Sequence, residues 1–132
     1  MRSLDTNVLV RYLAADDRRQ LAVAERLIDA CTREAETLFL CLPVLCELVW
    51  VLSRSYGQSR EQIASVVNQL LEMSIVRMEH QELVARALTS YRRGKGNFSD
   101  YLIGELGRHA GCRDTVTFNK ALRGAPGFTV LD

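Results

Sequence analysis

The fold is indicated first by the stretch SLDTNVLVRYL, residues 3–13. A very short apolar run, Ser3 to Asp5, leads into a segment from Val8 to Leu13 that can start a helix, with Thr6 or Asn7 as its N-cap. The stretch therefore predicts a strand, a turn and a helix. Sites in open parallel sheets form outside the carboxyl ends of the strands, so the acid that directly follows this strand, Asp5, is a candidate site residue.

The same alternation continues along the chain. Strands are predicted at 37–42, 74–77, 115–118 and 128–131, and helices at 20–31, 43–55, 60–71, 81–91 and 99–110, with Ser59 and Ser99 as two of the caps. At 132 residues and 14.9 kDa the chain has the size of one domain. We therefore expect an α/β fold: one three-layer α/β/α domain over residues 1–132, around a central, mainly parallel sheet of four or five strands.

Composition narrows the class of protein. Seventeen Lys and Arg against sixteen Asp and Glu give a net charge of +1, so any contact with nucleic acid must come from local basic patches. The N-terminal apolar stretch is too polar and too short for a secretory signal, and no later segment resembles a membrane span. The four cysteines lack a C-x-x-C spacing, which disfavours a zinc site. We expect a cytoplasmic protein.

Two further acids stand out beside Asp5. Glu47 is the only charge between Leu45 and Leu52, so it must reach solvent, pair with a base or meet a cation. Asp100 lies near a predicted helix start, where acids are common, just as an Asp in the position of Asp5 is often a helix cap. Three carboxylates from such positions can converge at one end of a parallel sheet. They would then need a counter-ion, and oxygen ligands favour Mg²⁺ or Mn²⁺.

Four segments carry a resemblance to a known family: LDTN at 4–7, PVLCEL at 43–48, NFSD at 97–100 and TVTFN at 115–119. In order and spacing they resemble the successive motifs of the PIN-domain family, most closely its VapC-like toxin ribonuclease branch, over essentially the whole chain. The resemblance implies that Asp5, Glu47 and Asp100 are the catalytic, metal-binding acids. It also implies a set of supporting polar residues, namely Thr6, Asn7, Asn97, Thr117 and Asn119.

The sequence departs from the family pattern at two positions. Asn119 stands where the family commonly carries a fourth acid, and Asn97 replaces another frequent acid. Asn119 is either natural or an introduced replacement. An Asn carbonyl can accept a metal or water contact but supplies no charge, so a second metal would bind more weakly and activity would be reduced.

These observations predict a magnesium-dependent endoribonuclease, the toxin of a type II toxin–antitoxin pair. Single-stranded or looped RNA suits a narrow acidic site better than a duplex. The basic residues Arg92, Arg93 and Lys95 either guide the RNA or form a solvated loop. The resemblance implies a small antitoxin partner, and the apolar helix around Trp50, with Leu45, Val49 or Leu52, predicts a homodimer.

Two other functions fit parts of the pattern. A receiver-type phosphorylation switch also has clustered acids, but it needs an Asp after the third strand, where this chain has Arg77-Met78-Glu79. A degenerate PIN module that binds RNA or a protein without cleavage is the second alternative, and Asn119 favours it.

Overall fold

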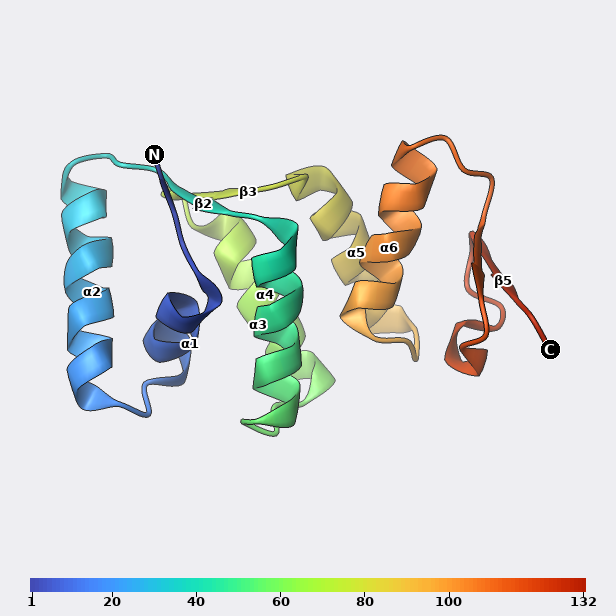
Figure 1. Cartoon of the computed structure of the whole chain (residues 1–132), viewed down its shortest axis with the longest axis horizontal. Helices are drawn as coiled ribbons and strands as arrows, with labels where there is room; N and C mark the ends of the chain where they lie inside the picture. The colour runs from blue at the N-terminus through green and yellow to red at the C-terminus, as the bar shows by residue number, and fades with distance from the viewer. The chain divides into compact units, whose positions relative to one another are not determined.

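A computed structural model describes residues 1–132, which divide into two compact units, Met1–Glu79 and His80–Asp132. Each unit has its own sheet and its own helices (Figure 1). The prediction of one domain over residues 1–132 stays a prediction.

The first unit contains three strands and four helices. Its elements are β1 (Arg2–Ser3), α1 (Thr6–Ala14), α2 (Arg18–Arg33), β2 (Leu38–Leu40), α3 (Leu42–Arg54), α4 (Arg60–Glu72) and β3 (Val76–Met78). The strands form a parallel sheet in the order β1-β2-β3, with Ser3 opposite Phe39 and Leu40 opposite Met78. Two helices connect each strand to the next, as parallel pairing requires a long crossover.

The core of the first unit lies where these helices meet the sheet. Helix α1 packs against α2 and α3, and α4 packs against α3 and β3 (Figure 1). Leu45 and Leu52 of α3 are fully buried in this core, so the expectation that they face a second copy is wrong. Leu45 and Leu52 are seven residues apart, which places them on the same face of α3, the face that packs against the core. Trp50, in contrast, is 60% exposed.

Two predicted caps of helices are corrected by the backbone. Asp5 is extended, with φ −84° and ψ 158°, so it occupies the N-cap position of α1, and Thr6 is already the first helical residue. Asn97 is likewise extended at the start of α6 (Phe98–His109), which places Ser99 inside that helix. The cap at Ser59 is confirmed: its hydroxyl accepts from Gln62 N, and the Gln62 side chain accepts from Ser59 N.

The second unit contains two helices, a short 3₁₀ turn and two strands. Its elements are α5 (Gln81–Arg93), α6, β4 (Thr115–Thr117), η1 (Lys120–Leu122) and β5 (Phe128–Val130). Helix α5 packs along α6, where the rings of Tyr91 and Phe98 meet edge to face at 5.9 Å. Strands β4 and β5 pair in parallel, with Thr115 opposite Phe128.

The predicted α/β class with parallel strands is confirmed. The five strands are hydrogen-bonded in two separate sheets, of three and of two strands, one in each unit. None of the helices combines the length and the apolar character that crossing a bilayer requires.

Candidate active site

Asp5 lies at the carboxyl end of β1, as predicted. Although it occupies the N-cap position of α1, its carboxylate makes no hydrogen bond to the first turn of that helix. The residue is exposed. An Asp in this position ordinarily accepts a bond from a helix N–H group. Because Asp5 does not, its carboxylate is available to a ligand.

Thr6 and Glu47 are joined by a hydrogen bond between side chains. The Thr6 hydroxyl donates to Glu47 Oε2 at 3.0 Å. Thr6 is 3% exposed, whereas Glu47 is exposed. The bond connects the start of α1, directly after Asp5, with α3, so it fixes one carboxylate oxygen of Glu47 and leaves Oε1 outside the bond. Asn7, the next predicted supporting residue, is exposed on α1.

The start of α3 is held by an acid that the sequence analysis did not single out. Leu42 N donates to Glu79 Oε1 at 2.8 Å, and Glu79 directly follows β3. A carboxylate at a helix N-terminus satisfies an unpaired N–H group and is favoured by the helix dipole. Glu79 therefore positions the helix that carries Glu47. The signal that identified Asp5, an acid directly after a strand, could have found it.

Asp100 binds two donors through the same oxygen. Its Oδ2 accepts from Asn97 N at 2.8 Å and from Asn119 Nδ2 at 3.2 Å. The first bond caps α6, so the structural role expected of an acid at a helix start is present. Asp100 is half-buried, and its Oδ1 lies outside both bonds.

Asn119 is oriented by its own backbone surroundings. Its Oδ1 accepts from Ala121 N at 3.0 Å, and its backbone N–H donates to the Thr117 hydroxyl at 3.0 Å. Because the amide oxygen is already engaged, the NH₂ group is the part that faces Asp100. The sequence allowed the Asn119 carbonyl to accept a metal contact, but in this geometry the side chain acts as a donor to Asp100.

The comparisons with known proteins identify the family of this chain. The family model of the PIN domain matches residues 3–127. The chain belongs to the PIN-domain family. It is similar to the VapC ribonuclease of Aquifex aeolicus (strain VF5), with 27% identity over 123 residues, which cover 93% of this chain and 90% of that protein. No solved structure shows a significant match to this PIN domain.

The donor groups of this PIN domain fit a hard divalent cation. Asp5 and Glu47 belong to the first unit and Asp100 to the second, and neither unit by itself brings together three His, Cys, Asp or Glu side chains as a metal-binding group. The half-buried Cys46, next to Glu47, is a poor ligand because burial raises the pKa of its thiol. Carboxylate oxygens therefore remain, and these suit Mg²⁺ or Mn²⁺. That the three acids bind one metal stays a prediction.

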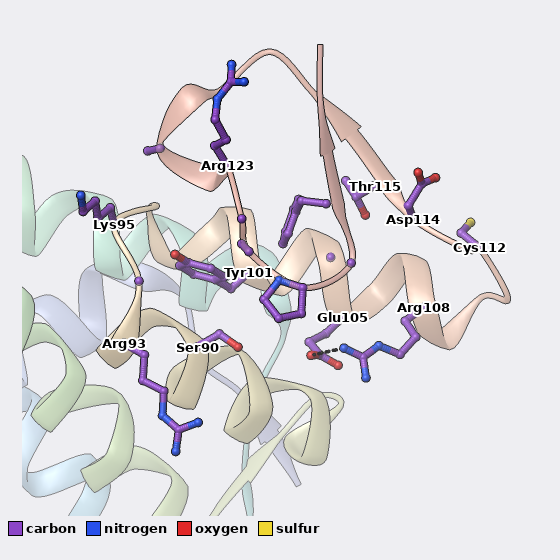
Figure 2. A pocket seen from close by; sticks show the side chains of 18 of the residues that line it. Ser90, Arg93, Lys95, Tyr101, Glu105, Arg108, Cys112, Asp114, Thr115 and Arg123 are labelled. Carbon is purple, nitrogen blue, oxygen red and sulfur yellow. Dashed lines mark hydrogen bonds and ion pairs between the residues drawn. The ribbon is translucent and has the colours of Figure 1, made fainter.

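The predicted basic segment borders a pocket in the second unit of the PIN domain. Arg93 and Lys95 line this pocket, whose volume is about 620 Å³, whereas Arg92 does not (Figure 2). The sequence analysis missed four further basic residues of the lining: Arg108, Arg113, Lys120 and Arg123. Their spacing along the chain gave no common signal, because these four residues come from three separate segments of the lining.

Proposed function

We propose that this PIN domain is a magnesium-dependent endoribonuclease, the toxin of a type II toxin–antitoxin pair, which cuts single-stranded or looped RNA. The observation that carries the proposal is the bond between the buried Thr6 hydroxyl and the exposed Glu47 carboxylate, directly beside Asp5. A buried donor that orients an exposed carboxylate is the support that metal ligands ordinarily have. The name of the Aquifex aeolicus relative, a ribonuclease, agrees with this function.

We propose Asp5, Glu47 and Asp100 as the catalytic metal ligands. Asp5 has a carboxylate that does not cap its helix, and Glu47 and Asp100 each keep one oxygen outside the bonds described above. A divalent metal bound there would activate a water and stabilise the leaving oxygen of a phosphodiester. Thr6 holds Glu47, while Asn97 and Asn119 hold Asp100. Thr117 holds the backbone of Asn119.

Partners are part of the same proposal. The family resemblance supports a small antitoxin that covers the acidic site. The exposed Trp50, three residues after Glu47 on α3, supports a homodimer through this part of the helix. Sedimentation of the parent and of Trp50→Ser tests the dimer: the parent should be dimeric and the variant should shift towards monomer.

A degenerate PIN module that binds RNA without cleavage is the second candidate, because Asn119 contributes a neutral donor where a fourth carboxylate would add charge. Incubation of the purified chain with unstructured and structured RNA, in Mg²⁺, Mn²⁺ or EDTA, decides between them. Cleavage that needs the metal and disappears in Asp5→Asn supports the nuclease. RNA binding without cleavage under every condition supports the degenerate module.

A further inference from the structure

The pocket of the second unit is enclosed by segments that surround Asp100 in the chain. The end of α5, one face of α6, the turn before β4 and the segment from η1 to the start of β5 contribute to its lining. In Figure 2 Arg93, Lys95 and Arg123 lie around the outer edge, and Tyr101 and Glu105 lie nearer the middle. Its volume of about 620 Å³ lies within the range of small-ligand sites.

The lining has an excess of positive charge. Six basic side chains face two acids, Glu105 and Asp114. Arg108 pairs with Glu105 at 3.4 Å and Arg123 pairs with Asp132 at 2.7 Å. The other four form no ion pair: Arg93, Lys95, Arg113 and Lys120. Unpaired cations around a concave surface attract phosphate groups.

Glu105 needs a hydrogen-bond donor for its carboxylate, which a simple anion does not supply. The residue is 7% exposed, and Arg108 reaches only its Oε1, while Oε2 is buried without any hydrogen-bond partner. A buried acceptor without a partner is unfavourable and rare. A ligand that joins an anionic group to an N–H donor would satisfy both features. A nucleotide is such a ligand, because its phosphate is anionic and its base edge carries N–H groups.

One aromatic side chain of the lining, the half-buried Phe128, favours a nucleotide over an acidic peptide, and it packs on the buried Tyr101. The rings of Tyr101 and Phe128 meet edge to face at 6.2 Å, and both residues line the pocket. Aromatic surfaces bind the planar faces of bases in proteins that recognise single strands. A carboxylate-rich peptide would use the cations but would bring its negative charge towards Glu105.

The basic loop is held in place against Tyr101. Gly96 N donates to the Tyr101 hydroxyl at 3.0 Å in a buried position. A Cβ at Gly94 would overlap the Tyr101 hydroxyl, and one at Gly96 would approach Leu122 to 2.6 Å. The glycines on both sides of Lys95 therefore permit a close approach of the loop to the residues beneath it. The loop that carries Lys95 is therefore packed against Tyr101 and Leu122.

Two residues of the pocket lining are next in sequence to Asp100 and to its hydrogen-bond partner Asn119. Tyr101 directly follows Asp100, and Lys120 directly follows Asn119, whose amide donates to Asp100. From this geometry we propose that the pocket binds one nucleotide of the RNA strand, with its phosphate held by Arg93, Lys95 and Lys120 and its base donating to Glu105. The proposal rests on RNA being the substrate and adds where, and by which groups, the strand is bound.

Binding of a short single-stranded RNA to the full chain in EDTA tests the proposal without any cleavage. Arg93→Gln, Lys95→Gln and Lys120→Gln should each weaken binding severalfold, and each should lower the slope of log K against log salt by about 0.7. The matched control is Arg86→Gln, an exposed residue of α5 that does not line the pocket and should bind as the parent does. Arg92→Gln should lose less affinity than its neighbour Arg93→Gln.

Base preference tests the role of Glu105. Guanine has adjacent N–H donors on one edge, so an RNA with one G in a run of U should bind the parent better than the run of U alone. Glu105→Gln should reduce this preference. Circular dichroism verifies that each variant is folded. If Glu105→Gln does not fold, Glu105→Asp, which keeps the carboxylate, serves as the second variant.

Three results overturn the proposal: pocket variants that bind RNA as the parent does, an equal loss in Arg92→Gln and Arg93→Gln, or a base preference unchanged in Glu105→Gln. An acidic peptide that binds more tightly than RNA and depends on the same residues would assign the pocket to a protein partner instead. Failure of the proposed nuclease is distinguishable. If the chain binds RNA through the pocket but does not cleave it in Mg²⁺, the pocket proposal stands and the proposed nuclease activity is wrong. If the pocket variants cleave RNA as the parent does, the nuclease activity stands and the pocket proposal is wrong.

Discussion

The amide nitrogen of Asn119 lies 3.2 Å from Oδ2 of Asp100 and donates a hydrogen bond to it. The bond spans 19 residues of sequence. Its direction is set by Ala121 N, which holds the amide oxygen of Asn119. A neutral donor therefore occupies the position next to Asp100 where a fourth carboxylate would introduce repulsion in the absence of metal.

Asn119→Asp tests this relationship. Ala121 N would hold one carboxylate oxygen, and the other would face Asp100, so we expect the metal-free protein to lose between about 1 and 4 kcal/mol of stability. Added Mg²⁺ should then raise the melting temperature more than in the parent, and cleavage should increase. Calorimetry of Mg²⁺ binding is the direct measurement. Unchanged metal affinity would place residue 119 outside the metal site. Asn119→Ala is the control for loss of the hydrogen bond from the Asn119 amide to Asp100.

Asp5→Asn and Asp100→Asn should both abolish Mg²⁺-dependent cleavage, with rate losses on the order of 100-fold or more, since each removes a proposed metal ligand. Their stabilities should differ. Asp5 makes no capping bond, so its replacement should leave the melting temperature equal or higher, because one charge fewer reduces the repulsion expected among the proposed ligands. Asn at position 100 keeps an oxygen acceptor for Asn97 N but loses the negative charge that the dipole of α6 favours, so this replacement should cost about 0.3–1 kcal/mol. Parental cleavage by either variant would refute its assignment as a ligand.

Thr6→Val removes the hydroxyl that donates to Glu47 and keeps the volume of a buried side chain. We expect Mg²⁺ affinity to fall by about 10-fold, because the carboxylate loses the donor that orients it. Thr6→Ser keeps a hydroxyl and should retain most of the affinity. Measurement by calorimetry in parallel with thermal unfolding separates the metal effect from a loss of fold. Equal Mg²⁺ affinity in the parent and Thr6→Val would show that the bond is only structural.

Tyr56→Phe should change how stability depends on pH. The Tyr56 hydroxyl donates to Asp16 Oδ2 at 2.7 Å, and this bond, with the nearby Arg11, holds the pKa of Asp16 below its ordinary value. A lowered pKa in the folded state stabilises the protein above the unfolded-state pKa, and this stabilisation is lost as pH falls through the folded-state pKa.

The difference in urea midpoint between the parent and Tyr56→Phe should therefore be present at neutral pH and shrink below the ordinary Asp pKa of 3.8. The effect should be small because Asp16 is exposed, so solvent screens its interactions. In an Asp16→Asn background the Tyr56 replacement should lose this pH dependence. A difference that stays constant from neutral to acid pH would disprove the linkage.

Local spacing determined most of the secondary structure. The apolar periodicity predicted the helices, and the pairing of Ser59 with Gln62 is a local signal that the structure confirms. Glu47 stood out because it is the only charge in an apolar run, and Asp5 because it directly follows a predicted strand, whereas Asp100 is ordinary at a helix start and was singled out by the family motif that contains it. The starts of α1 and α6 were misplaced by one or two residues, because the backbone turns helical at Thr6 and Phe98 while several nearby side chains could serve as caps.

Only the tertiary structure decided which groups meet. The Thr6 hydroxyl reaches Glu47 across 41 residues, and the amide of Asn119 turns its donor towards Asp100 only because Ala121 N occupies its oxygen. The basic pocket brings Lys95 and Lys120 together with Arg108 from α6. Residue spacing controls contacts within a helix or turn, since those contacts follow from local backbone geometry. Contacts across longer separations depend on how the elements pack, which no local pattern encodes.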